Sequence, residues 1–289
     1  MQQKNYWLIL KLLILLVPLY SCNGKESITV RTGTFEQFLL YSNEVQDSFY
    51  INAYLPKEYS TDKEYKILLI LDGDRFRSAT LHGNDFFQEQ NIIVINPGYT
   101  ESITSYSGKR TRDYTTTVST WEGHGDNGHG TGQGASFYRF LKQELKPFLE
   151  NQLPIDTTEG FGLMGHSFGG LFTTYALLQT TETNNFIDKF IIESPSLWWD
   201  GGTIFGEEKN YATKHTGKKI PVKVYMMVGT FESALMNAYT DEMYQHWQNN
   251  GYLFEDLNYE VFSGTAHSWG VTPDLEARQL NGLKYIYSL

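Results

Sequence analysis

The stretch FGLMGHSFGGLF, residues 161–172, sets one serine, Ser167, among four glycines. The apolar residues before the serine are typical of a buried strand, and those after it are spaced as in a helix. Gly165, Ser167 and Gly169 fit the pattern G-x-S-x-G, in which glycines allow a sharp strand-to-helix turn that presents the hydroxyl. This pattern predicts a nucleophilic serine. The alternative is a glycine-rich strand end with a purely structural role.

The surroundings of this turn predict a layered α/β fold. Short, continuous apolar runs indicate strands buried on both faces: KILLIL (66–71), NIIVIN (91–96), KFIIES (189–194) and VKVYMMVG (222–229). Helical periodicity recurs between them, in 134–151, 168–179, 233–249 and 273–287. The alternation predicts one doubly wound, mostly parallel sheet with helices on both faces.

Two further stretches differ from this regular pattern. SFYINAYLP (48–56) alternates apolar and polar residues, which indicates a half-buried, antiparallel strand near an edge. Residues 97–134 are rich in Gly, Thr, Ser and Tyr and fit neither a strand nor a helix. We expect a long connection there that shapes a site, because structureless loops of that length are otherwise uncommon.

Composition excludes some classes of protein. The chain has 289 residues, of which 40% are hydrophobic and 19% charged, as in a globular protein rather than a disordered one. Its net charge of -10 argues against a nucleic-acid partner, because such partners need basic surfaces to neutralise phosphates.

The N-terminal residues 1–22 read as an export signal. Lys4 precedes an apolar run that is too short to span a membrane, and the segment ends in LYSC. This ending resembles the lipobox of bacterial lipoproteins, which implies lipidation of Cys22 and a membrane-anchored protein of the bacterial cell envelope, periplasmic or surface-exposed. The alternative is an unmodified cysteine beside an ordinary cleavage site. Cys22 is the only cysteine, so no intramolecular disulfide forms.

A serine hydroxyl needs a base and an acid to become a nucleophile, and on such a sheet both follow it in the chain. His267 lies in a loop of small residues, SGTAHSW, just after the strand-like LNYEVF, whereas the other late histidine, His246, lies on a helical stretch. We therefore predict His267 as the base. Glu232 directly follows the run VYMMVG and is our predicted acid. Asp241, Asp256 and a helix-capping role for Glu232 remain alternatives.

Two backbone amides are expected to hold the oxyanion that forms during attack. The amide of Phe168 lies at the start of the predicted helix, where the N–H groups and the helix dipole favour negative charge. A second amide should come from the loop LDGDRF, from Gly73 or Asp74. Gly73 is equally explained as an ordinary turn residue.

From about residue 28 to residue 289 the chain resembles the putative-esterase group of α/β-hydrolases, which includes esterase D and the enterochelin, feruloyl and acetylxylan esterases. The resemblance rests on YLP, LLILDGDRF, RTRDYTTT, FLKQELKPFLE, GHSFGG, ESPSLWW and GTAHSW in that order. It implies an α/β-hydrolase fold, here as a single domain over 23–289, with Ser167 as nucleophile, Glu232 as acid and His267 as base.

The insertion TWEGHGDNGHGTGQG (120–134) departs from the group by its length and glycine content. It contains His124, Asp126 and His129, a conceivable metal set. Because glycine-rich loops hold ligands poorly, we expect a flexible lid and neither a metal nor a cofactor.

Other residues are candidates for contact with a substrate. Arg112, with Arg110 and Asp113, either contacts it or braces the cleft floor. Trp198 and Trp199 form either an aromatic wall or part of the core. His166, next to the nucleophile, is a further candidate.

The expected reaction is hydrolysis of a carboxylic ester through an acyl-enzyme. The substrate would be a siderophore trilactone or an acetyl or feruloyl ester of a polysaccharide. Acyl transfer to an alcohol and a non-catalytic, ligand-binding lipoprotein are the alternatives.

Overall fold

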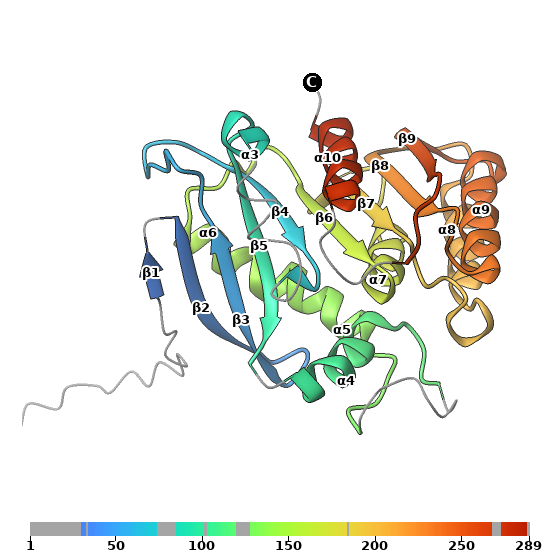
Figure 1. Ribbon diagram of the computed structural model, residues 1–289, viewed down its shortest axis with the longest axis horizontal. Coiled ribbons are helices and arrows are strands. Elements are labelled where there is room, and N and C mark those ends of the chain that lie inside the picture. The colour runs from blue at the N-terminus through green and yellow to red at the C-terminus, as the bar shows by residue number, and fades with distance from the viewer. Residues whose placement is uncertain are drawn as a thin grey trace, which may run out of the picture.

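The computed structural model describes residues 30–32, 34–73, 85–100, 103–119, 128–183, 185–267 and 273–287. Their strands form one nine-stranded sheet in the order β1-β2-β3-β5-β4-β6-β7-β8-β9 (Figure 1). The strands are β1 (Val30–Thr32), β2 (Phe35–Ser42), β3 (Asp47–Tyr54), β4 (Lys66–Ile70), β5 (Ile92–Tyr99), β6 (Phe161–His166), β7 (Ile187–Glu193), β8 (Lys219–Gly229) and β9 (Leu253–Phe262). From β4 to β9 all neighbours pair in parallel, whereas β1, β2 and β3 add to one edge in antiparallel fashion.

Helices cover both faces of this sheet. They are α3 (Asp85–Glu89), α4 (Ile103–Tyr114), α5 (Gly134–Arg139), the π-helical η1 (Phe140–Leu145), α6 (Lys146–Gln152), α7 (Phe168–Leu177), the short 3₁₀ turn η2 (Trp199–Gly201), α8 (Ile204–His215), α9 (Ala234–Asn249) and α10 (Pro273–Tyr287). The predicted α/β class, mostly parallel sheet and two helical layers are therefore confirmed.

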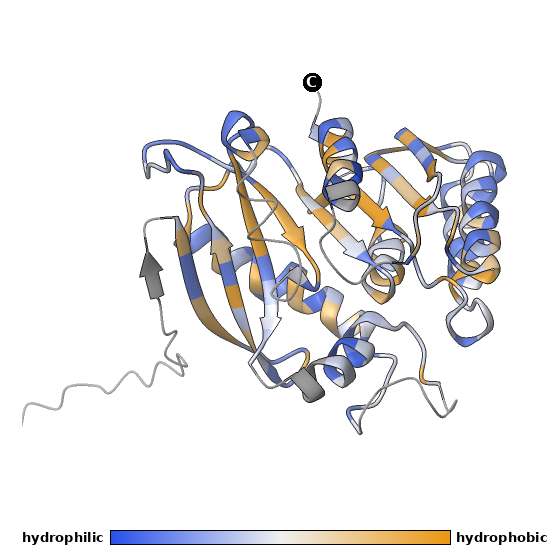
Figure 2. Ribbon diagram, viewed as in Figure 1, coloured by the Kyte–Doolittle hydropathy of each residue, from blue (hydrophilic) through white to orange (hydrophobic). Residues whose placement is uncertain are grey.

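The two faces of the sheet bury two separate apolar clusters. Along β4, Ile67 and Leu69 point into the larger cluster, which α5 to α9 cover, while Leu68 and Ile70 point into the smaller one, under α3 and α10. Figure 2 shows the resulting concentration of hydrophobic residues in the central strands. Because successive strand residues face opposite sides, burial on both sides produces the continuous apolar runs seen in the sequence.

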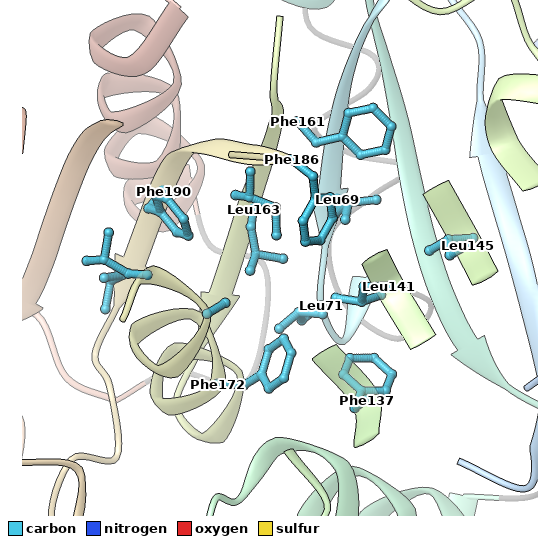
Figure 3. Packing of buried hydrophobic residues seen from close by; sticks show 14 of the residues in the cluster. Leu69, Leu71, Phe137, Leu141, Leu145, Phe161, Leu163, Phe172, Phe186 and Phe190 are labelled. Atoms are coloured by element: carbon cyan, nitrogen blue, oxygen red, sulfur yellow. The ribbon is translucent and has the colours of Figure 1, made fainter. Parts of the chain in front are cut away.

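The larger cluster lies directly behind the turn that carries Ser167. Phe172 of α7 packs edge-on against Phe137 of α5, with 5.0 Å between ring centroids, and Leu71 lies beside them (Figure 3). This packing fixes the start of α7 relative to the carboxyl ends of the central strands, where ligands bind in open α/β sheets.

The expectation of a long irregular connection over 97–134 is wrong for part of that range. Strand β5 continues to Tyr99, and α4 occupies 103–114. Its buried face is polar: Lys109, Arg110 and Asp113 are all buried and paired with opposite charges. A search for apolar residues at helical spacing misses such a helix.

Several features predicted from the sequence lie outside the described residues, among them the segment 1–22 with Cys22 and the greater part of the 120–134 insertion. Within the part of the chain that the structure describes, no helix combines the length and apolar character of a membrane span.

Candidate active site

Ser167 occupies a strained turn between β6 and α7. Its backbone angles are φ 61° and ψ −119°, a conformation that non-glycine residues rarely adopt. A Cβ atom on Gly165 would lie 2.2 Å from the carbonyl oxygen of Gly169, so a side chain at 165 would not fit. The Ser167 amide donates to the Glu193 carbonyl at 3.1 Å, which ties the turn to β7. Strain held by such surroundings is typical of functional sites.

The structure brings the three predicted reactive side chains together. The Ser167 Oγ lies 3.2 Å from His267 Nε2, and His267 Nδ1 lies 2.8 Å from Glu232 Oε2. Because an ionised carboxylate only accepts hydrogen bonds, Nδ1 is the protonated nitrogen and Nε2 is left to accept from the serine hydroxyl. The Glu232 side chain is 1% exposed and that of His267 25%, so the pair is sheltered but open on the histidine side.

Glu232 and His267 sit on two turns that are hydrogen-bonded to each other. Beyond β8, the Phe231 amide donates to the Thr265 carbonyl at 2.8 Å, and beyond β9 the Gly264 amide donates to Thr230 Oγ1 at 2.8 Å. The turns approach so closely that a Cβ on Gly229 would lie 2.2 Å from the Thr265 carbonyl oxygen. The predicted acid and base are thus held as one unit. The alternative acids do not reach it, since Asp241 bonds to Tyr259 and Asp256 to Tyr285.

Two serines missed in the sequence analysis also lie at this site. Ser194 Oγ donates to Glu232 Oε1 at 2.5 Å, and Ser196 Oγ lies 3.3 Å from Ser167 Oγ. Both belong to ESPS, which begins at the last residue of β7. The signal in the sequence that could have identified both serines is their position at the carboxyl end of a buried strand.

A cavity of about 520 Å³ opens beside Ser167 and His267. Its lining consists of Arg110, Ser167, Phe168, Ser196, Trp198, Glu232, Ser233, Leu235, Met236 and His267. The exposed wall is largely apolar, and the three reactive side chains are part of the lining. That is the usual character of a small-molecule pocket.

The two tryptophans have different environments. Trp198 lines the cavity, as expected of an aromatic wall. Trp199 is only 1% exposed, packs edge-on against Phe168 at 5.2 Å and donates its Nε1 hydrogen to Thr117 Oγ1 at 3.1 Å. The prediction of a substrate contact is therefore wrong for Trp199, which belongs to the core behind the wall.

Arg112 likewise lies away from the cavity. It donates to Asp113 Oδ1 at 2.7 Å and to Asp47 Oδ2 at 3.0 Å, and thereby braces α4 against β3. Burial raises the pKa of Asp113, while the hydrogen bond and charge of Arg112 oppose that rise. The bracing alternative holds for Arg112, and the substrate-binding one does not.

Arg110 provides a cationic group in the cavity wall. It pairs with Asp72 through two hydrogen bonds, of 2.8 and 2.7 Å, and lies over the Phe168 ring at 5.4 Å from the ring centroid. Arg110 of α4 therefore contacts both the residue that precedes Gly73, beyond β4, and Phe168 at the start of α7. The first N–H groups of a helix have no partner within it. Asp74 lies outside the described residues.

His166 stacks on the predicted base. Its ring lies 4.5 Å from that of His267, with 29° between the planes. It is absent from the lining of the cavity, so the expectation of a substrate contact is not met there. Of the metal candidates, only His129 is described. No group of three possible ligands occurs among the residues with assigned positions.

Comparisons with known proteins identify the family to which the chain belongs. A family model described as "Putative esterase" matches residues 42–272. Ferri-bacillibactin esterase BesA from Bacillus subtilis (strain 168) is 25% identical over 282 residues, which cover 89% of this chain and 95% of the relative.

Solved structures show the same fold. The BES protein from Bacillus cereus has a TM-score of 0.71 and 23% identity, covering 91% of this chain and 100% of that one. Siderophore hydrolase EstA from Aspergillus nidulans has a TM-score of 0.69 and 18% identity, covering 88% and 97%. With the family model spanning most of the chain, this protein belongs to the Putative esterase family and is a carboxylic ester hydrolase.

Proposed function

We propose that the protein is a serine esterase that hydrolyses the ester bonds of a siderophore trilactone through Ser167, His267 and Glu232. The observation that carries the proposal is the 3.2 Å contact between Ser167 Oγ and His267 Nε2 at the wall of the cavity. The substrate class is supported by relatives named ferri-bacillibactin esterase, siderophore enterobactin esterase and siderophore triacetylfusarinine C esterase.

In the first half-reaction, Ser167 Oγ attacks the ester carbonyl and its proton passes to His267 Nε2. Glu232 stabilises the imidazolium through Nδ1. The amides of Phe168 and Gly73 are the proposed donors to the oxyanion. The intermediate then collapses, the leaving alcohol takes the proton from His267, and the acyl group stays on Ser167.

In the second half-reaction, water attacks the acyl-enzyme and gives its proton to His267. Collapse releases the carboxylic acid and returns the proton to Ser167. The lining of the cavity suits an acyl group that carries an aromatic ring, because Phe168 and Trp198 offer aromatic surfaces beside the nucleophile.

The test compares kcat/KM of the wild type on a tricatecholate trilactone, on feruloylated and acetylated xylan, and on a short-chain nitrophenyl ester. We expect preferred cleavage of the trilactone to linear products. We also expect Ser167→Ala to lose about 10⁴-fold or more in kcat, as when other triad nucleophiles are removed. Mapping of a fluorophosphonate label should find it on Ser167.

Two results would reject parts of the proposal. Equal rates for wild type and Ser167→Ala would reject the proposed triad. Cleavage of xylan esters in preference to the trilactone would reject the proposed substrate class. An added alcohol that captures the acyl group in place of water would favour acyl transfer.

A further inference from the structure

We propose that Ser194 is a positioning residue that holds the Glu232 carboxylate in place for its contact with His267; this inference rests on the triad proposed above. The two oxygens of Glu232 have separate partners. Oε2 lies 2.8 Å from His267 Nδ1, and Oε1 accepts from Ser194 Oγ at 2.5 Å. The hydroxyl therefore engages the oxygen that the histidine leaves open.

The backbone holds Ser194 firmly in this position. It directly follows β7, and its amide donates to the Met227 carbonyl of β8 at 2.8 Å. Its φ of 43° lies in the left-handed region, where an L-residue is strained. Ser194 is also only 2% exposed. A strained, buried, polar residue beside a reactive group points to a role in that site.

The chemistry gives this hydrogen bond a direction. The ionised carboxylate has no hydrogen to give, so the Ser194 hydroxyl is the donor. A buried carboxylate with only one partner is poorly satisfied and free to turn about its side-chain bonds. Ser194, just after β7, holds one oxygen, and His267, in the turn after β9, holds the other. Rotation of the Glu232 carboxylate away from Nδ1 would therefore break two hydrogen bonds.

The experiment is a double-mutant cycle with Ser194→Ala and Glu232→Gln, measured on a short-chain nitrophenyl ester. We expect Ser194→Ala alone to lower kcat by about 10- to 100-fold, the range for a hydrogen bond to a charged group, with KM nearly unchanged. In the Glu232→Gln background the same substitution should have little further effect, because the carboxylate that Ser194 orients toward His267 has been replaced by a neutral amide. Titration with a fluorophosphonate normalises each rate to the number of competent sites.

Ser42 supplies a matched control. Ser42 is the last residue of β2, on the antiparallel side of the sheet and away from the triad. It is fully buried, and its Oγ donates to Glu144 Oε2 at 2.6 Å. Ser42→Ala therefore removes a similar bond to a carboxylate, together with the bond that Ser42 Oγ accepts from the Val45 amide at 3.0 Å, without touching the triad. It should lower the melting temperature while leaving kcat and KM unchanged. Ser194→Gly is the second variant, because glycine adopts a positive φ without strain and keeps the turn if alanine does not.

The outcomes separate this inference from the proposed function. If Glu232→Gln loses activity but both Ser194 variants keep wild-type kcat, the positioning role is rejected and the triad stands. An equal loss from Ser194→Ala in both backgrounds also rejects it, in favour of a general structural effect. If Ser167→Ala and Glu232→Gln both retain activity, the triad itself is rejected.

Discussion

A single methyl group at residue 165 would disturb the turn that presents the nucleophile. The Cβ of Gly165→Ala would lie 2.2 Å from the Gly169 carbonyl oxygen and 2.5 Å from Thr173 Oγ1. Since the first of these is backbone, α7 must shift away from β6. We expect a loss of about 1–3 kcal/mol in the free energy of unfolding and a fall of about 100-fold in kcat from the misplaced hydroxyl. Urea unfolding and ester hydrolysis measure the two effects.

Gly206→Ala is the matched control for that substitution. Gly206 lies in α8, and no atom other than those of the adjoining helix backbone would come within 4 Å of an added Cβ. Alanine is favoured over glycine in a helix by about 1 kcal/mol, so this variant should be slightly more stable and equally active. A Gly165→Ala enzyme with wild-type kcat would contradict the account of the turn.

Among single residues, those with a distinctive local sequence were the predictable ones. Ser167, His267 and Glu232 were chosen from motif context and chain order, and the structure places them within hydrogen-bonding distance of one another. Ser194 was not, because a serine after a strand has many structural uses. The difference between Trp198 and Trp199 depends on the path of η2 and is invisible in the sequence WW.

At the scale of elements, α4 is held to β3 by charge, and this makes its docking sensitive to acid. Asp47 at the start of β3 lies 2.8 Å from Lys109 Nζ and 3.0 Å from Arg112 Nη1. Partial burial acts to raise the pKa of Asp47, but hydrogen bonds from Lys109, the Ser48 amide and Arg112 together hold it below the usual 3.8. A lowered pKa stabilises the fold above the unfolded value, and the stabilisation is lost as pH falls through the folded value.

The corresponding prediction concerns Asp47→Asn. We expect it to reduce the free energy of unfolding by about 1–2 kcal/mol at pH 7, with solvent screening keeping the loss modest, and by less near pH 3, which lies below the usual pKa of 3.8. Urea unfolding at both pH values measures this. Asp62→Asn, at an exposed carboxylate, is the control and should leave the free energy of unfolding unchanged at both pH values. An equal loss from Asp47→Asn at both pH values would show that its charge is unimportant.

The same element shows why part of the fold was missed. Helices with an apolar stripe, such as those at 168–177 and 234–249, were predicted well because their buried face is hydrophobic. Most of the buried residues of α4 are polar or charged, with Tyr114 as the exception, and such a segment resembles a solvated loop in the sequence. Strand β2 was also missed, since the alternation in FEQFLLYS breaks down along its length.

At the scale of the whole molecule, buried and half-buried tyrosines predict sensitivity to alkali. Burial, with a smaller contribution from Tyr175, raises the pKa of Tyr138 to about 12, and burial raises that of Tyr211 to about 12. A raised pKa stabilises the fold fully below the unfolded value near 10, and that stabilisation is lost as pH rises toward 12.

We therefore expect unfolding above pH 10 to coincide with the appearance of tyrosinate absorbance, followed together with far-ultraviolet circular dichroism. Tyr138→Phe should move the alkaline midpoint upward, because it removes one group that must ionise on unfolding. Titration of all tyrosines near pH 10 in a chain that remains folded would refute this explanation.

The overall architecture was the most predictable level. Continuous apolar strands alternating with amphipathic helices leave few arrangements other than a covered parallel sheet. What the pattern does not contain is the position of polar groups that face one another across the sheet, because those contacts join residues far apart in the chain.

The 100-residue separation between Ser167 and His267 has a consequence for biosynthesis. Ser167 leaves the ribosome well before His267, the residue that accepts its proton. His267 follows β9, the last strand of the sheet, which must bring it into place. The growing polypeptide thus carries a serine without its base, and reactivity toward esters begins only when β9 has joined the edge of the sheet.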